Sequence, residues 1–391
     1  MERFSGILLH PTSLPGKYGI GTLGKEAFHF IDFLAKARQK YWQILPLGPT
    51  GYADSPYQCF SSHAGNPFLI DLEDLADAGL ITREDLQSAD VFDDGPVDFG
   101  KVIQIKIPLL KKAFRTFRET AHEDVLIDFR NFINSISWWL DDYVLFMALK
   151  EHFGQKPWTL WDPSFKLKQE EAIRPLLPVL EESMNFHKFI QYIFFRQYFK
   201  VRDYAHQNNV SIIGDIPLYV AMDSADTWSH SELFQFDENK NPVSVGGVPP
   251  DYFSSTGQLW GNPIFRWDEM EKDGYSWWIE RIQSSLQLYD IIRIDHFRGF
   301  AGYWSVPFGE KTAVRGEWIK GPGKKLFEKI RSQLGSIPII AEDLGVITGD
   351  VIDLRDSFGL PGMKILQFAF DSSEANDYLP HNYSKNCVVY T

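Results

Sequence analysis

The sequence is poor in cysteine and has no long apolar run. Its 391 residues include two cysteines, Cys59 and Cys387. These are too few for a disulfide framework, and we expect them to be free thiols of a cytoplasmic protein. No apolar stretch is long enough to cross a bilayer, and the first residues, MERFS, lack the basic and then apolar pattern of a secretory signal. We therefore expect a cytoplasmic protein without a membrane anchor.

Sequence signals for cofactors and for anionic partners are also missing. No cysteine and histidine spacing is typical of a zinc site, and no glycine-rich loop is typical of nucleotide binding. The chain carries 52 acidic residues against 39 basic ones, a net charge of -13. This excess argues against binding to nucleic acid or to an anionic membrane surface. We expect no metal, no organic cofactor and neither of those partners.

The chain is instead rich in apolar and aromatic residues. With 44% hydrophobic residues, it can bury a large core, either as one large barrel with an insertion or as two domains. Aromatic residues make up 15% of the chain, including 12 tryptophans. Most should lie in the core, but some of these rings could stack on the apolar faces of sugars.

Residues 289–300, YDIIRIDHFRGF, are the most informative stretch. Their isoleucine-rich run predicts a buried parallel strand. Arg293 and Asp295 are two residues apart and should point to one face, with Ile292 and Ile294 on the other. The pair could be a structural ion pair. It could equally be a nucleophilic carboxylate that the neighbouring guanidinium keeps charged.

Two other predicted strands also end in acids, which favours the catalytic interpretation. Residues 337–345, IPIIAEDLG, reach Glu342 and Asp343, and residues 210–217, VSIIGDIP, reach Asp215. Asp215 could alternatively cap the following segment. Acids at the carboxyl ends of successive barrel strands converge on one site, so we predict that these side chains share an active site.

The motifs RIDHFRGF and AEDLG resemble those of the 4-α-glucanotransferases called amylomaltases or disproportionating enzymes, relatives of the α-amylases. The segments SPYQ and AGNP within residues 51–68, and the glycine- and proline-rich residues 245–263, extend the resemblance. It implies an α/β fold of the TIM (β/α)8-barrel type with a helical insertion. It also implies a hexosyltransferase that acts on α-1,4-glucans, including maltooligosaccharides.

The resemblance also implies roles for individual residues. Asp295 would be the nucleophile and Glu342 the general acid and base. The candidate sugar-binding residues are Tyr57, Asp215, Asp251, Gln258, Trp260, Arg293, His296 and Asp371. Among them, Arg293 would orient Asp295, and His296 would either hydrogen-bond a sugar hydroxyl or simply pack.

The predicted elements follow a β/α order with a helical interruption. We expect strands at 6–9, 42–47, 210–217, 289–295, 337–342, 363–368 and 387–391, and helices at 25–38, 105–119, 127–153, 186–208, 275–288, 323–335 and 348–358. Residues 245–263 and 304–307 are predicted to be loop. Residues 1–70 would begin the barrel, 71–185 form the helical insertion and 186–391 continue the barrel. Core positions in the insertion are expected for Trp138, Trp139, Trp158 and Trp161.

The predicted barrel has fewer elements than its family pattern. In the family, a His-Asp pair follows the segment YT and supplies a third carboxylate, whereas this sequence ends at Thr391. We expect a fragment that is truncated before the last β/α unit, with poor solubility or weak activity.

The expected reaction is retaining transglycosylation, for which the two carboxyls should lie about 5 Å apart, with Asp343 facing away. Two alternatives stay open: an α-glucan hydrolase of the amylase clan, which uses the same carboxylates with water as acceptor, and a catalytically silent glucan-binding fragment.

Overall fold

The computed structural model describes residues 3–92, 95–251, 254–370 and 376–391. The chain forms two compact units, Met1–Ile212 with Asp223–His230, and Ile213–Met222 with Ser231–Thr391. It passes from the first unit to the second within strand β3 (Ser211–Pro217). Among the helices that the structure describes, none has both the length and the apolar character needed to cross a membrane.

The first unit opens with a β-α-β segment. Strands β1 (Gly6–Leu8) and β2 (Tyr41–Gln43) pair in parallel and are joined by helix α1 (Lys25–Lys36). One face of α1 is fully buried through Ala27, Ile31 and Leu34, which follow the helical spacing. The predicted strand at 42–47 is shorter than expected, because Ile44 to Leu47 leave the strand while staying mostly buried.

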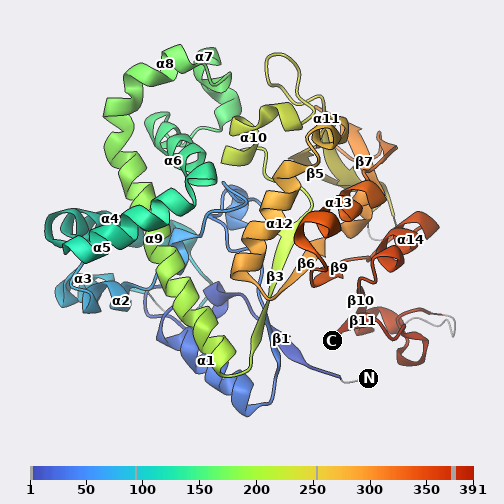
Figure 1. Cartoon of the computed structure of the whole chain (residues 1–391), viewed down its shortest axis with the longest axis horizontal. Coiled ribbons are helices and arrows are strands. Elements are labelled where there is room, and N and C mark those ends of the chain that lie inside the picture. The colour runs from blue at the N-terminus through green and yellow to red at the C-terminus, as the bar shows by residue number, and fades with distance from the viewer. Residues whose placement is uncertain (1–2, 93–94, 252–253, 371–375) are drawn as a thin grey trace. The chain divides into compact units, whose positions relative to one another are not determined.

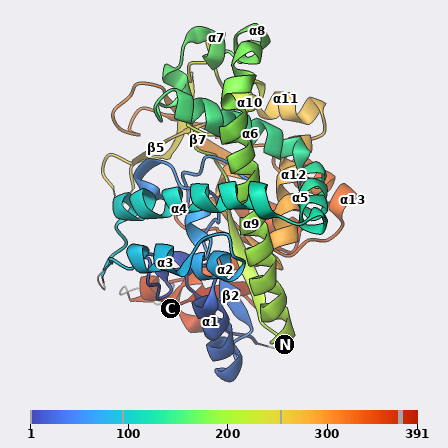
Figure 2. The ribbon, with the colours of Figure 1, turned by 90° about the vertical axis from the view of Figure 1, so that its left-hand side faces the viewer.

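The rest of the first unit is helical, as predicted for residues 71–185. Its helices are α2 (Leu72–Asp77), α3 (Arg83–Ala89), α4 (Phe99–Thr120), α5 (Glu123–Ser135), α6 (Ser137–His152), α7 (Pro163–Lys166), α8 (Glu170–Ile173), α9 (Leu177–Gln207) and α10 (Ala225–Ser229). Helix α9 contacts α1, α4, α5 and α6, and Figure 2 shows α4 crossing its length. Helix α9 therefore organises this unit.

Three of the four tryptophans predicted to lie in the helical core do so. Trp139, Trp158 and Trp161 are buried, whereas Trp138 is 48% exposed. The prediction for Trp138 is wrong because α5 and α6 break at Ile136 instead of forming one helix over 127–153. Trp138 then lies at the start of α6 and packs edge-on against His63.

The second unit contains the acid-bearing strands. Strand β6 (Ile291–Asp295) pairs in parallel with β3 on one side and with β9 (Ile339–Ala341) on the other. Helices α12 (Ser276–Leu288), α13 (Lys324–Leu334) and α14 (Gly349–Ser357) precede β6, β9 and β10 (Gly362–Ile365) in the chain, and β10 pairs in parallel with β11 (Cys387–Tyr390). Figure 1 shows α12 and α13 beside these strands. A short helix, α11 (Trp267–Lys272), comes before α12.

The second unit also holds an antiparallel sheet that the sequence did not predict. Its order is β5 (Gln258–Pro263), β4 (Ser244–Val248), β7 (Gly302–Pro307) and β8 (Glu317–Lys320). The loop predictions for 245–263 and 304–307 are therefore wrong over these strands. The glycines that suggested a loop allow close packing instead: a Cβ on Gly246 would lie 2.6 Å from the ring of Tyr219.

The prediction of an α/β fold is confirmed by this alternation of helices and parallel strands. Within the described part of the second unit, the parallel strands form the row β3-β6-β9 and the pair β10-β11 rather than a closed ring. The closed eight-stranded barrel and the domain limits at residues 70 and 185 remain predictions.

Candidate active site

Strand β6 presents Arg293 and Asp295 on one face, as its alternation predicts. The opposite face carries Ile292 and Ile294, both fully buried in the core of the second unit. Arg293 Nη2 donates a hydrogen bond to Asp295 Oδ1 at 2.8 Å. The side chain of Asp295 remains 32% exposed, so the core fixes the backbone of the strand while solvent still reaches this carboxylate.

The same guanidinium holds Asp215 on the neighbouring strand. Asp215 lies directly opposite Arg293 in the β3–β6 register. Arg293 Nη1 donates to both carboxylate oxygens of Asp215, at 2.7 and 2.8 Å. Asp215 is 3% exposed, and a carboxylate this deeply buried needs such a charged partner. Arg293 therefore orients two carboxylates from adjacent strands and fixes the direction of Asp295.

Glu342 follows the end of β9 and is held by the backbone. Its Oε2 accepts a hydrogen bond from His296 N at 2.7 Å, and its Oε1 accepts one from Leu344 N at 2.9 Å. The strand ladder continues past β9, because Glu342 N donates to Ile294 O and Phe297 N donates to Glu342 O. These bonds place the Glu342 side chain beside the end of β6.

Glu342 has the electrostatics of an acid that is protonated near neutral pH. Burial, followed by the negative charge of Asp295, raises its pKa from 4.5 to about 7. The charge of Arg293 and the hydrogen bonds from Leu344 N and His296 N act in the opposite direction and only partly offset this rise. The guanidinium of Arg293 thus acts on three carboxyl groups, pairing with Asp215 and Asp295 and partly offsetting the raised pKa of Glu342.

The neighbouring Asp343 has a structural role. Its Oδ1 accepts a hydrogen bond from Met363 N at 2.7 Å, and its Oδ2 pairs with Arg355 on α14. These partners differ from those of Glu342, in keeping with the expectation that the two side chains face apart. Asp343 therefore ties β9 to β10 and α14.

His296 has a strained backbone and a neutral ring. It adopts φ +54°, a left-handed conformation that is uncommon outside glycine, and this turn lets its N–H reach Glu342. Burial, and then the charge of Arg298, lowers the pKa of the ring to about 3. Its Nε2 is buried without a hydrogen-bond partner among the described residues. Whether His296 binds a sugar hydroxyl or only packs remains a prediction.

An aromatic pair lies against His296. The ring of Trp260 on β5 meets the His296 ring edge-on at 4.7 Å between centroids, and Tyr219 lies at 6.4 Å. Trp260 Nε1 donates to Gln258 Oε1 at 3.1 Å. Trp260 and Gln258 thus form one partly exposed surface next to His296. Tyr219 is not among the predicted site residues, although its place two residues after the end of strand β3, which carries Asp215, is a usable signal.

The other predicted sugar-binding residues are not brought to this cluster by the described contacts. Asp251 Oδ1 accepts a hydrogen bond from Ser254 N at 2.8 Å. Tyr57 belongs to the first unit, and Asp371 lies outside the described residues. Their roles remain predictions. In the part of the chain that the structure describes, no group of three or more His, Cys, Asp or Glu side chains could hold a metal ion.

Comparisons with known proteins identify the family of the chain. A sequence profile described as 4-alpha-glucanotransferase, of glycoside hydrolase family 77, matches residues 9–391. The 4-alpha-glucanotransferase of Thermus thermophilus is 52% identical over 393 residues, which cover 100% of this chain and 78% of that protein. The 4-alpha-glucanotransferase of Clostridium butyricum is 51% identical and covers 98% of this chain and 78% of its own length.

Solved structures are similar as well. Amylomaltase from Streptococcus agalactiae, in complex with acarbose, superposes with a TM-score of 0.96 at 43% identity, covering 100% of this chain and 79% of that one. Amylomaltase from Corynebacterium glutamicum, at 19% identity, gives a TM-score of 0.82 and shows the fold alone. The chain therefore belongs to the 4-alpha-glucanotransferase family, whose members act on α-glucans.

Proposed function

We propose that this glucanotransferase moves α-1,4-glucan segments by a retaining double displacement, with Asp295 as nucleophile and Glu342 as general acid and base. The observation that carries the proposal is the different environment of the two carboxyls. Arg293 donates a hydrogen bond to Asp295 at 2.8 Å, while burial, followed by the charge of Asp295, raises the pKa of Glu342 to about 7. Retaining glycosyl transfer needs one carboxylate that attacks and one carboxyl that can give up and take back a proton.

In the first half-reaction, an oxygen of Asp295 attacks the anomeric carbon of the donor glucan. The glycosidic bond breaks, and the proton of Glu342 moves to the departing 4-oxygen. The donor segment is then bonded to Asp295, and Glu342 is ionised. Asp295 suits this role because the exposed part of its side chain can meet a substrate.

In the second half-reaction, ionised Glu342 removes the proton from the 4-hydroxyl of an acceptor glucan. The resulting oxygen attacks the same anomeric carbon and releases Asp295, so the original configuration is restored. The same pKa of about 7 serves both steps, because an acid near neutrality can give and take a proton at similar cost. Glucose and maltooligosaccharides are the expected acceptors.

The surrounding residues bind and orient. Asp215 would bind a sugar hydroxyl, the role that the family resemblance implies. His296 Nε2 would contact another hydroxyl, and Trp260 would offer an aromatic face. Asp251, Gln258, Tyr57 and Asp371 are proposed to extend this binding surface.

Two alternatives use the same residues and are separated by product analysis. Transfer from maltotriose yields longer oligosaccharides while the concentration of reducing ends stays constant. Hydrolysis raises that concentration steadily, and a silent glucan-binding protein changes neither. Asp295→Asn should abolish transfer yet leave maltotriose binding largely intact. Unchanged transfer in that variant would refute the assignment of the nucleophile.

Three finer expectations belong to this proposed function. The parallel strands are expected to belong to an eight-stranded barrel. The substrates are expected to be maltooligosaccharides and longer α-1,4-glucans. A cytoplasmic location is expected from the low number of cysteines.

A further inference from the structure

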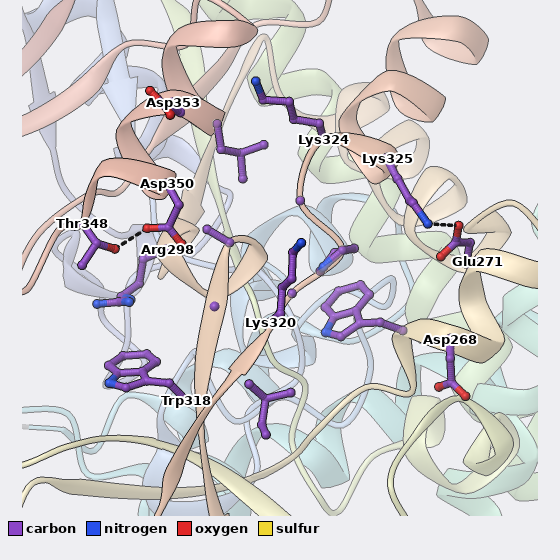
Figure 3. A pocket seen from close by; sticks show the side chains of 18 of the residues that line it. Asp268, Glu271, Arg298, Trp318, Lys320, Lys324, Lys325, Thr348, Asp350 and Asp353 are labelled. Carbon is purple, nitrogen blue, oxygen red and sulfur yellow. Dashed lines mark hydrogen bonds and ion pairs between the residues drawn. The ribbon is translucent and has the colours of Figure 1, made fainter.

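The second unit contains a cavity of about 950 Å³ whose lining does not include Asp295 or Glu342. Its walls include residues of α11, of strand β8, of the start of α13, and of α14 with the segment before it (Figure 3). The volume is within the range of small-molecule sites. The reaction described above makes no use of this cavity.

The character of the lining points to a neutral, hydroxylated ligand. Four basic and four acidic side chains line the cavity, so their charges nearly cancel. In Figure 3, the carboxylates of Asp350 and Asp353 lie on one side and those of Asp268 and Glu271 on the other, with Lys320 between them. Such alternating donors and acceptors match sugar hydroxyls, which can both donate and accept, better than they match a phosphate.

Trp318 supplies a rigid aromatic surface at the edge of this cavity. The guanidinium of Arg298 lies 3.9 Å from the centroid of its indole ring, and Trp304 packs against it at 5.3 Å. Nevertheless, 43% of Trp318 is exposed. A ring already fixed by its neighbours loses little conformational entropy when a ligand stacks on it.

Arg298 holds the ring of Trp318 in place and also carries an N–H group for a hydrogen bond to a ligand. The residue is 8% exposed, and its Nη1 donates to Val346 O. Its Nε is buried and has no hydrogen-bond partner in the described part of the chain. A buried N–H without an acceptor is costly, and a hydroxyl bound in the cavity could satisfy it directly or through water.

We propose that this cavity is a second α-glucan-binding site, in which Trp318 stacks on a glucose ring and the mixed acidic and basic lining binds its hydroxyls. The site would hold a remote part of a long substrate. The proposal rests on the family's α-glucan substrates, but it does not depend on which residues catalyse the transfer.

The test measures the number of glucan-binding sites per chain in a variant that cannot catalyse transfer. Titrating the Asp295→Asn chain with maltoheptaose in a calorimeter should give one more binding event per chain than titrating the Asp295→Asn, Trp318→Ala chain. Trp318→Phe should retain the event with weaker affinity. Trp138→Ala, which removes an exposed tryptophan of the first unit, is the matched control and should lose no event.

A second variant distinguishes the loss of this binding site from misfolding of the Trp318→Ala chain. Asp353→Ala changes an exposed residue of the cavity and should weaken the same event at least tenfold. Equal numbers of events and equal affinities in all of these chains would overturn the proposal. It would also be overturned if inorganic phosphate bound in a Trp318-dependent manner while maltoheptaose did not. Failure of Asp295→Asn to stop transfer would refute the catalytic assignment and leave the site count valid.

Discussion

Replacing Glu342 with glutamine should change the stability of the protein in opposite directions at acidic and at alkaline pH. The two oxygens of Glu342 accept hydrogen bonds from His296 N and Leu344 N. An amide replaces one of these acceptors with an NH₂ group, which faces a backbone donor. At pH values where the parent carboxyl is protonated, the variant should be less stable by about 1–3 kcal/mol.

At higher pH, folding of the parent must bury an ionised Glu342, which lowers its stability. The variant has no ionisable group at this position, so its stability lacks this dependence on pH. The pKa of Glu342 is about 7 in the folded chain against 4.5 as its ordinary value. Because the folded value is the higher one, the unfolded chain releases the proton first, and the parent's stability falls as pH rises from 4.5 to 7. About 2.5 pH units at about 1.4 kcal/mol each give a loss of about 3.5 kcal/mol. Because this loss exceeds the cost of about 1–3 kcal/mol that the variant shows at low pH, the variant should be more stable than the parent at pH 8.

Urea unfolding of both proteins at pH 5 and pH 8, followed by far-UV circular dichroism, measures this effect. Taking the difference between the two proteins cancels every other titrating group. The free-energy difference should shift by about 2–3 kcal/mol in favour of the variant between these pH values. A difference that stays constant with pH would refute the raised pKa of Glu342 and, with it, the reason for assigning the acid.

Three further outcomes follow from the same structure. In the parent, kcat/KM should fall about tenfold per pH unit above pH 7, because the first step needs the protonated acid; a flat profile up to pH 9 would contradict this. Arg293→Met leaves Asp215 and Asp295 without their shared cation, so unfolding free energy should drop by about 3–5 kcal/mol, measured by denaturation against an Arg293→Lys control. Gly246→Ala places a methyl group 2.6 Å from the Tyr219 ring and should lower the unfolding free energy by about 1–3 kcal/mol, and unchanged thermal unfolding would argue against this packing.

The acid-bearing strands were predictable because their pattern is local. Ile292 and Ile294 alternate with Arg293 and Asp295, and a period of two fixes which side chains share a face. The family resemblance supplied the order of these strands and the role of Glu342. The glycine and proline residues at 245–263 predicted a loop where strands β4 and β5 lie. Gly246 is needed there for close packing against Tyr219, and no local sequence pattern shows this contact.

The electrostatics of the site were less predictable. The pairing of Arg293 with Asp215 depends on the register of two strands 78 residues apart. The raised pKa of Glu342 results from burial and from the negative charge of Asp295. Both effects exist only in the folded chain. The stacking of Arg298 on Trp318 likewise joins distant segments. Sequence patterns predicted which acids share the site, whereas the partners of these acids and the pKa of Glu342 required the tertiary contacts.

The most direct test of the catalytic proposal is to trap the bond to Asp295. In Glu342→Gln, a maltotriosyl fluoride donor needs no proton for its leaving group, so the first step proceeds while the second lacks its base. Mass spectrometry of the digested protein should find one maltotriosyl group on the peptide that contains Asp295. An unmodified peptide, or the sugar bound at another residue, would contradict the account.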